Sequence, residues 1–310
     1  MVKAVVIGAN GFLGSHLVDA LSAAGHVVTA FDRFSSEFPT YTARDVRRIV
    51  GDFQNRSDIR AAVDGQDVVF HFLSATSPAT ADSDPSLDVS MNIAPTIQLL
   101  EASVEAGISR CYYASTGGAI YGNQGKSTYS ETDRTLPVSP YGIGKLAIEN
   151  YLVFFRARHG LTSTILRISN PYGPRQHPNK RQGLIPIVLR QLQRGLPVVR
   201  MGDGSMVRDY LYVGDLVQMI VSMAAAETHR FSTYNLGSGV GHSINEVLDT
   251  IRTVTRRDFE VETVDAPSTY VDRVVLDVAR FTDEFGVSTS TSLTEGIHTT
   301  FVSESEHPSE

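Results

Sequence analysis

Residues 3–24, KAVVIGANGFLGSHLVDALSAA, decide the fold of this chain. They open with a short, largely apolar and β-branched run that is typical of a buried parallel strand. Gly8, Gly11 and Gly14 follow at once, and a helical pattern begins after them. Glycines in this position allow a tight turn and a close approach of the backbone to a pyrophosphate at the helix N-terminus. A plain glycine turn is the alternative, but the complete strand–turn–helix context favours a dinucleotide site.

The second predicted strand, residues 26–31 (HVVTAF), ends at Asp32. Its distance from the glycine turn is close to the ~20 residues at which an acid binds the adenine-ribose hydroxyls of NAD. A carboxylate there would repel the 2′-phosphate of NADP, whereas the neighbouring Arg33 could accommodate that phosphate. The other interpretation of Asp32 is a turn-forming residue at the strand end.

The alternation of strand and helix continues through the first half of the chain. Apolar runs predict further strands over residues 47–52, 66–72, 109–115 and 161–169. Helical patterns begin near Ser57 and cover residues 92–107, with Asn92 opening that helix, and residues 140–159. Five strand–helix units followed by a sixth strand predict an α/β fold with a doubly wound parallel sheet of the Rossmann type.

The composition changes after Gly173. Residues 175–183 (RQHPNKRQG) are polar and basic, which fits either a solvated surface loop or a clamp for an anionic ligand. Short predicted strands and helices follow, including a helix that starts at Asp215. Residues 303–310 (SESEHPSE) are expected to be disordered.

A chain of 310 residues is long enough for one large domain or two closely packed ones. We expect a dinucleotide-binding domain over residues 1–170, rejoined by part of residues 208–240. A smaller α/β C-terminal substrate domain is expected mainly over residues 171–310.

The composition also excludes several classes of function. The formal charge of -7 gives no basic footprint for nucleic acid. The single cysteine, Cys111, has no partner for an internal disulfide, which favours a reducing cytoplasm. No apolar run approaches the ~20 residues of a membrane span. The histidines show no metal-ligand spacing, so no metal site is expected, and His71 lies in an apolar run that is typical of a core histidine.

A tyrosine and a lysine in SPYGIGK (residues 139–145) supply the candidate chemistry. Tyr141 and Lys145 are four residues apart, which places them on the same face of a helix. A neighbouring ammonium favours the phenolate, which can act as a general base on an alcohol. Such a pair is common by chance, so its meaning depends on the dinucleotide site found above.

Other polar side chains stand at predicted strand ends. Ser115 and Thr116 end the strand beside the Tyr141 helix, where they could hydrogen-bond a reacting alcohol or form a turn. Asp52 could face an adenine or cap the helix that begins near Ser57. Arg208 lies in a strand-like segment, where an unpaired charge is costly. Its partner is an anionic ligand, or else Asp209 or Asp203 nearby in the sequence.

Seven motifs in this order resemble the extended short-chain dehydrogenase/reductase family. They are GANGFLG (8–14), Asp32, Asn92, ASTGGAIYG (114–122), SPYGIGK (139–145), LRISNPYGP (166–174) and GDGSMVRDY (202–210). The similarity covers the chain from Lys3 to about Leu276. It is strongest to the NAD-dependent nucleotide-sugar epimerases and dehydratases, with UDP-hexose 4-epimerases foremost.

The resemblance implies NAD as cofactor and a role for each matched residue. The glycines would wrap the pyrophosphate, Tyr141 would be the general base, and Lys145 would bind the nicotinamide ribose and lower the tyrosine pKa. The implied cofactor set is Gly8, Asn10, Gly11, Phe12, Leu13, Gly14, Asp32, Arg33, Asp52, Phe53, Leu73, Asn92, Tyr141, Lys145 and Tyr172. The implied catalytic set is Tyr141, Lys145, Thr116 and Ser115. The implied substrate set is Thr116, Asn170, Gly183, Leu184, Arg208, Asp272 and Arg273.

The chemistry implied by the resemblance is 4-epimerisation of a nucleotide-diphosphate sugar, UDP-glucose/galactose or the N-acetylglucosamine/galactosamine pair. Hydride would pass from sugar C4 to NAD and return to the other face of a transient 4-keto sugar. A keto-sugar 4-reductase or dehydrogenase of the same family is the alternative. The resemblance also implies a cytoplasmic homodimer, formed through helices near residues 92–106 and 140–158, that serves carbohydrate metabolism and polysaccharide biosynthesis.

The chain departs from the family pattern at two positions and in residues 271–277 (VDRVVLD), a segment that is shorter than in many relatives. Gly117 stands where the family has serine or threonine, so Thr116 or Ser115 would supply the hydroxyl. The Arg-x-x-Asp signature falls on Thr269 to Asp272 without its arginine, which Arg273 could replace. Gly118 and Ala119 stand where dehydratases carry Asp-Glu and other relatives carry a glutamate or cysteine. These residues cannot transfer protons, which leaves oxidation and reduction at C4 as the favoured chemistry.

Overall fold

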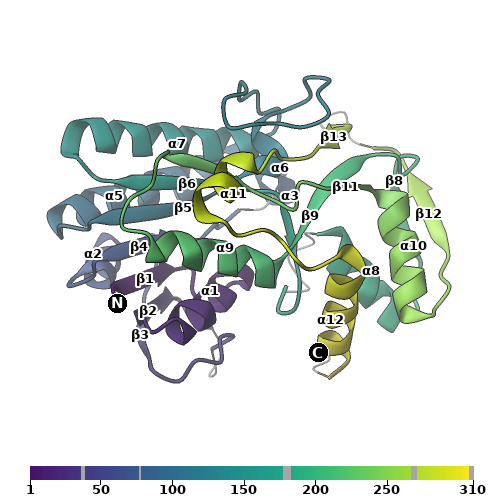
Figure 1. The fold of residues 1–310 in the computed structure, drawn as a ribbon, viewed down its shortest axis with the longest axis horizontal. Helices are drawn as coiled ribbons and strands as arrows, with labels where there is room; N and C mark the ends of the chain where they lie inside the picture. Colours follow the sequence, from purple (N-terminus) through teal and green to yellow (C-terminus); the bar gives the residue numbers. More distant parts are fainter. Residues whose placement is uncertain (36–38, 77, 177–182, 267–270, 307–310) are drawn as a thin grey trace.

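The computed structural model describes residues 1–35, 39–76, 78–176, 183–266 and 271–306. Within this part of the chain, a 7-stranded sheet forms the centre of the larger lobe (Figure 1). Its strands are parallel and follow the order β10-β6-β5-β4-β1-β2-β3. They are β1 (Lys3–Ile7), β2 (Val27–Asp32), β3 (Val46–Val50), β4 (Val68–His71), β5 (Arg110–Thr116), β6 (Ser163–Ile168) and β10 (Thr233–Leu236). This order confirms the expected doubly wound α/β fold.

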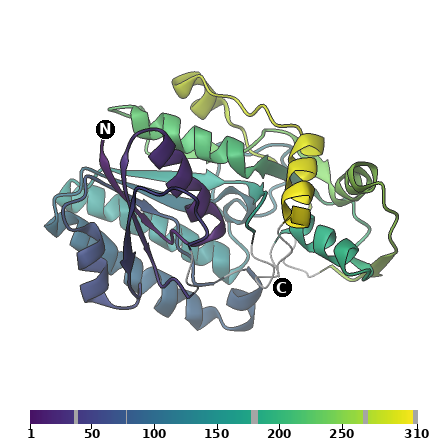
Figure 2. The same ribbon diagram turned by 90° about the horizontal axis from the view of Figure 1, so that it is seen from below.

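Helices cover both faces of the sheet (Figures 1 and 2). For this reason residues 4–7 of the central strand have no exposed surface. One face packs on α1 (Phe12–Ala23) and α9 (Val213–Ala225). The other packs on α2 (Arg56–Val63), α5 (Ala94–Glu105) and α7 (Pro140–His159). Each face of the sheet therefore has a hydrophobic core of its own.

Shorter elements complete the larger lobe. They are α3 (Pro78–Ser83), α4 (Pro85–Asp88), the π-helical turn η1 (Val89–Ile93), α6 (Gly117–Ile120) and α11 (Ala279–Phe285). The chain enters the smaller lobe after β6. Three later elements return to the larger lobe: α9 packs on α1, β10 pairs with β6, and α11 packs against β10.

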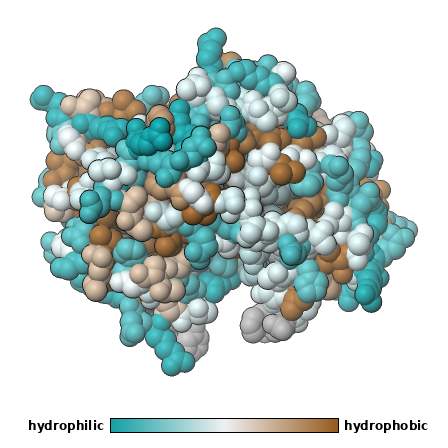
Figure 3. Space-filling view, viewed as in Figure 1, coloured by the Kyte–Doolittle hydropathy of each residue, from teal (hydrophilic) through white to brown (hydrophobic). Residues whose placement is uncertain are grey.

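The smaller lobe consists of two short sheets and three helices, at the right of Figure 1. Its strands are β7 (Asn170–Tyr172), β8 (Val198–Met201), β9 (Val207–Tyr212), β11 (Gly241–Ser243), β12 (Val261–Val264) and β13 (Arg273–Val274). Its helices are α8 (Leu184–Gln193), α10 (Ile244–Thr255) and α12 (Leu293–Glu306). They share one hydrophobic core, which includes Tyr172, Ile185, Val247 and Ile297. Figure 3 shows the molecular surface hollowed between the larger lobe and the region of α12, at the lower edge of that view.

Two sequence-based helix starts are wrong. The helix expected to open at Asn92 begins earlier, because Asp84 caps α4 through the Ser86 amide and Pro85 occupies its first turn. Asn92 therefore lies inside η1, which continues directly into α5. The helix expected from Asp215 starts at Val213, so Asp215 belongs to its first turn.

The expected disorder of residues 303–310 is wrong for residues 303–306, which belong to α12. Leu293, Ile297 and Phe301 recur every four residues, and Ile297 is fully buried in the core of the smaller lobe. This apolar stripe explains the helix, whereas residues 307–310 lie outside the described part. Among the described residues, no helix is long and apolar enough to cross a bilayer.

Candidate active site

The glycine turn between β1 and α1 is packed so closely that side chains do not fit. Gly8 has φ +89°, and a Cβ there would lie 2.7 Å from the Leu73 amide nitrogen. A Cβ on Gly14 would lie 2.0 Å from the Gly8 carbonyl oxygen, and one on Gly11 would lie 3.2 Å from it. Gly11 is the N-cap residue of α1 and has no side chain that could cap the helix. The first amides of the helix, at Phe12 and Leu13, therefore receive no hydrogen bond from an N-cap side chain. The turn therefore fits the pyrophosphate of a dinucleotide.

Asp32 lies beside this turn at the end of β2. One carboxylate oxygen accepts a hydrogen bond from the Asn10 amide (2.9 Å) and the other from the Arg33 amide (2.7 Å). The Asn10 side chain in turn accepts from the Thr40 amide (2.7 Å). The structure thus brings Asp32 and Asn10 together, while the Arg33 residue is exposed.

Asp52, predicted to face the adenine, and Phe53, a further residue of the predicted cofactor set, differ in exposure. Asp52 is exposed after β3, and its carboxylate accepts from the Gln54 amide (2.9 Å). The alternative that it caps α2 is wrong, because the Asn55 side chain caps that helix through the Ser57 amide. Phe53 is buried, with its ring centroid 5.1 Å from that of His71, so its side chain belongs to the core.

Tyr141 and Lys145 lie on the first turns of α7, beside β5. The Ser139 side chain caps the helix by accepting from the Gly142 amide (3.2 Å), and Pro140 occupies the first turn. Lys145 is buried, and its Nζ donates to the Ala114 carbonyl oxygen (2.9 Å). The same Nζ is 5.7 Å from the ring centroid of Tyr141. The structure therefore places the two groups close together at the carboxyl edge of the sheet.

The electrostatic state of the pair is set mainly by burial. Burial, followed by the negative charge of Asp88, raises the pKa of Tyr141 to about 12. Burial lowers the pKa of Lys145 to about 8, against the raising effects of Asp88 and Glu149. Burial and the Asp88 carboxylate thus raise this pKa in the chain by itself, and the lowering of the tyrosine pKa by Lys145 stays a prediction.

The two candidate hydroxyls at the end of β5 have different partners. Ser115 Oγ donates to Glu149 Oε1 (2.5 Å) and is buried. Thr116 is also buried, but its side chain does not cap α6, which starts at the next residue. A Cβ on Gly117 would lie 2.5 Å from a Leu276 methyl carbon, so a family-type serine has no room there. Thr116 is therefore the better candidate for the missing hydroxyl.

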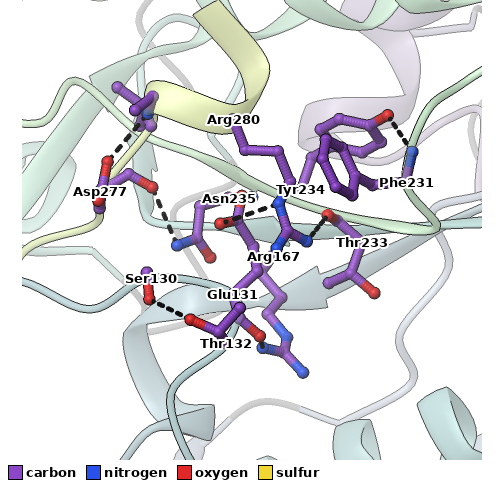
Figure 4. Close-up of polar contacts among 12 residues, drawn as sticks. Ser130, Glu131, Thr132, Arg167, Phe231, Thr233, Tyr234, Asn235, Asp277 and Arg280 are labelled. Atoms are coloured by element: carbon purple, nitrogen blue, oxygen red, sulfur yellow. Dashed lines mark hydrogen bonds and ion pairs between the residues drawn. The ribbon is translucent and has the colours of Figure 1, made fainter. Parts of the chain in front are cut away.

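A buried polar network that the sequence did not reveal supports this strand end. Arg167 Nη2 donates to Glu149 Oε2 (2.8 Å), and its Nη1 donates to the Tyr121 hydroxyl (3.1 Å). Tyr121 donates to Asn235 Oδ1 (2.6 Å), and Asn235 Nδ2 donates to the Asp277 carbonyl oxygen (3.1 Å; Figure 4). The network joins β5, β6, β10 and α7. The available signal was a pair of charges, Glu149 and Arg167, inside otherwise apolar patterns.

Asn92 is held in a second buried cluster. Its Oδ1 accepts from the Ala75 amide (2.8 Å), and its Nδ2 donates to Thr76 Oγ1 and to Asp88 Oδ1 (both 2.7 Å). The side chain therefore ties the loop after β4 to η1. A contact of Asn92 with the cofactor stays a prediction.

Tyr172, a residue of the predicted cofactor set, lies in the smaller lobe. Its ring is 2% exposed, lies in the core of the smaller lobe, and is 5.9 Å from the ring of Tyr212. Burial raises the pKa of its hydroxyl, which points at α12, where a Cβ on Gly296 would lie 2.1 Å away. The side chain is thus used in packing, and a contact of Tyr172 with the cofactor stays a prediction.

Two predicted substrate residues stand at the start of α8. Gly183 has φ +91° and precedes Leu184, which packs partly buried on the core of the smaller lobe. Of the polar segment 175–183, residues 177–182 lie outside the described part of the chain. Its first residue, Arg175, forms an ion pair with Asp19 (2.7 Å).

Asn170 and Arg208 lie on the paired strands β7 and β9. Asn170 Nδ2 donates to the Asp209 carbonyl oxygen (3.0 Å), and the side chain faces Gly118 at the start of α6. Arg208 Nη1 donates to the Val207 carbonyl oxygen (2.8 Å). The buried Asp209 carboxylate accepts from the Ser238 amide and hydroxyl (2.8 and 2.7 Å).

The remaining predicted substrate residues contact the loop that follows α6. Asp272 Oδ2 accepts from Asn123 Nδ2 (2.9 Å), and Arg273 Nε donates to the Ser127 carbonyl oxygen (2.9 Å). Thr269, the start of the family signature, lies outside the described residues. Across the described ranges, no group of three metal-ligating side chains is found.

Comparison with known proteins places this geometry in a family. The model of the NAD dependent epimerase/dehydratase family matches residues 4–237. The chain therefore belongs to this family. It is 32% identical over 302 residues to a UDP-glucose 4-epimerase of Mycolicibacterium smegmatis, with 96% of each chain covered.

Solved structures show the same similarity. The UDP-glucose 4-epimerase of Thermotoga maritima, solved with UDP-glucose, has a TM-score of 0.92 and 32% identity, covering 99% of this chain and 100% of that one. The UDP-glucose 4-epimerase of Thermus thermophilus, solved with NAD, has a TM-score of 0.90 and 31% identity, covering 98% and 99%.

Proposed function

We propose that this chain is an NAD-dependent 4-epimerase of a nucleotide sugar, acting on UDP-glucose/galactose or on UDP-N-acetylglucosamine/galactosamine. The observation that carries this proposal is that Tyr141 and the buried Lys145 lie at the same sheet edge as a turn in which Gly8 and Gly14 leave no room for side chains. Similarity over the whole chain to UDP-glucose 4-epimerases supports the choice of reaction and of nucleotide.

The residues at this edge fit NAD. The glycine turn and the first amides of α1 would hold the pyrophosphate, and the Asp32 carboxylate would accept hydrogen bonds from the adenine ribose. Bound NAD supplies a hydride acceptor that can also return the hydride. Because Asp32 is an acid beside the turn, the 2′-phosphate of NADP is disfavoured.

Tyr141 would act as general base and then general acid toward the sugar O4 hydroxyl. It accepts the O4 proton as C4 is oxidised to a ketone and gives it back as C4 is reduced on its other face. The high pKa of Tyr141 makes its phenolate a minor form at neutral pH, and the Lys145 ammonium is the nearby cation that favours this form. The Thr116 hydroxyl would hydrogen-bond O4 and orient it toward the tyrosine.

The smaller lobe would bind the nucleotide diphosphate. Asn170 and Arg208 lie on the paired strands β7 and β9, and Asp272 and Arg273 lie on the neighbouring strand segment. We accordingly propose the division into a cofactor domain, residues 1–170 with part of 208–240, and a substrate domain drawn mainly from residues 171–310. A neutral Gly118 and Ala119 beside the strand end favour epimerisation over dehydration.

We further propose that the protein is a homodimer. Ile143, Tyr151 and Phe154 form an apolar stripe on α7 and are 55%, 38% and 53% exposed. Burial of this stripe against a second copy would use the helices expected for the dimer. A cytoplasmic location and a role in carbohydrate metabolism, including polysaccharide biosynthesis, belong to the same proposal.

Incubation of the purified protein with UDP-glucose, UDP-N-acetylglucosamine or UDP-glucuronate, without added NAD, tests the function. Proton NMR should show a new C4 epimer of one of these sugars. Silence with all three, in protein shown to contain NAD, would contradict the proposal. A stoichiometric change in NAD(P)H absorbance would instead indicate the keto-sugar reductase.

A further inference from the structure

Asp88 is a buried residue that has no role in the proton transfer proposed above. It ends α4 and is 4% exposed. Its Oδ1 accepts hydrogen bonds from Thr76 Oγ1 (2.6 Å) and Asn92 Nδ2 (2.7 Å). Because Asn92 is itself held by the Ala75 amide, the carboxylate has a fixed position.

This carboxylate lies against α7 between the two residues of the candidate pair. Gly144 directly precedes Lys145 and is three residues after Tyr141. A Cβ on Gly144 would lie 1.5 Å from Asp88 Oδ2 and 2.6 Å from its carboxyl carbon. Asp88 therefore occupies the space in which any other residue at position 144 would place its side chain.

Asp88 is a negative charge that acts on both members of the pair. It adds to the effect of burial in raising the pKa of Tyr141, and it opposes the lowering of the Lys145 pKa by burial. Such a charge favours the ammonium of the lysine and the neutral phenol of the tyrosine.

The other ionisable groups around the pair come from three elements. Glu149 on α7 also raises the pKa of Lys145, but it forms a buried ion pair with Arg167 (2.8 Å). Tyr113 on β5 and His71 on β4 are buried and neutral, because burial raises the pKa of the former and lowers that of the latter to about 3. Asp88 differs from Glu149 in that its hydrogen-bond partners, Thr76 and Asn92, are uncharged and leave its negative charge uncompensated by an ion pair.

We propose that Asp88 is a positioning residue, whose fixed carboxylate sets the balance of charge between Tyr141 and Lys145 and so the pH range in which they work. This inference rests on the proposed proton transfer by the pair. The close contact at Gly144 makes the charge effective, because Asp88 Oδ2 lies directly against the helix between the two residues.

The Asp88→Asn variant tests the charge while keeping the shape. The pH profile of kcat should move to lower pH by about one unit on both limbs, because Tyr141 and Lys145 would each lose a proton more easily. The matched control is Asp84→Asn, which removes the same charge from the exposed cap of the same helix and should leave the profile unchanged. Identical profiles for Asp88→Asn and the wild type would overturn the proposal.

A second set of variants tests the contact without relying on turnover. Gly144→Ala should lower Tm by several degrees in the wild type, because the new Cβ displaces the carboxylate. In an Asp88→Ala background, which removes the obstructing atoms, the same change should cost little or nothing. Equal losses of Tm in both backgrounds would overturn the geometry. Failure of the wild type to epimerise any sugar would count against the proposed function alone.

Discussion

The cofactor end and the substrate end of the candidate site are built in different ways. At the cofactor end, backbone approaches backbone so closely that a Cβ on Gly14 would lie 2.0 Å from a carbonyl oxygen. At the substrate end, the side chains of Arg208 and Arg273 reach across to the carbonyl oxygens of Asp272 and Ser127 on neighbouring segments. The first arrangement tolerates little change in sequence, whereas the second can be altered by single side chains. We therefore expect binding of the cofactor pyrophosphate to depend on the fold and sugar specificity to depend on local substitutions.

The largest effect is expected from Tyr141→Phe, at the junction of the two ends. Loss of the proton-transferring hydroxyl should lower kcat by about 10²- to 10⁴-fold. Bound NAD, measured after acid release from the protein, should be unchanged. Tyr151→Phe on the exposed side of the same helix is the control and should keep full activity. A Tyr141→Phe enzyme with normal turnover would disprove the assigned role.

The substitution of glycine by alanine separates the two ends directly. Gly14→Ala should reduce the NAD retained on purification by tenfold or more, because its Cβ collides with the Gly8 carbonyl. Gly118→Ala at the substrate end meets only ordinary contacts, with Asn170 atoms 3.5 Å away, and should retain NAD. Equal NAD content in the two variants would contradict the view that only the cofactor end depends on close backbone packing.

At the substrate end, Arg208→Gln should raise KM for the nucleotide sugar by about 10- to 100-fold, which corresponds to the loss of a charge-assisted hydrogen bond. Its kcat should change much less. Arg200→Gln is the matched control, because Arg200 donates within its own lobe to Asn245 Oδ1 (3.0 Å) and Thr263 Oγ1 (2.9 Å). A similar rise of KM in the control would indicate damage to the smaller lobe instead of a lost contact.

The smallest effects distinguish the two hydroxyls of β5. Thr116→Val should lower kcat by roughly tenfold, the loss expected for one hydrogen bond to the reacting oxygen. Ser115→Ala should change kcat by less and lower the stability by about 1–3 kcal/mol, because Glu149 loses a buried donor. Kinetic assays and urea unfolding of both variants would measure the losses in kcat and in stability. A larger loss of kcat in Ser115→Ala than in Thr116→Val would show that Ser115 is the hydroxyl that contacts the sugar.

The sequence predicted the cofactor end better than the rest, for a physical reason. Strand, glycine turn and helix are local patterns, so β1, α1 and the position of Asp32 could be read along the chain. The Arg167 network and the Asp88 cluster join residues far apart in the sequence, such as Tyr121 with Asn235 and Thr76 with Asp88. No periodicity reports such contacts.

Other differences arose where tertiary packing decided the outcome. The tail looked polar, but Ile297 and its neighbours place α12 on the core of the smaller lobe. Tyr172 followed a site motif, yet its ring fills that same core. The pKa of Tyr141 could not be inferred from the Lys145 spacing. It is raised by burial and by the carboxylate of Asp88, which is far from Tyr141 in the sequence but lies against the same helix.

The central claim, that hydrogen leaves C4 and returns to it within one site, is tested most directly by isotope labelling. The nucleotide sugar that turns over would be prepared with deuterium at C4 and incubated with the enzyme in ordinary water. The account predicts that the epimer keeps its deuterium at C4, because the hydride never exchanges with solvent. Loss of deuterium from the product to water would contradict it.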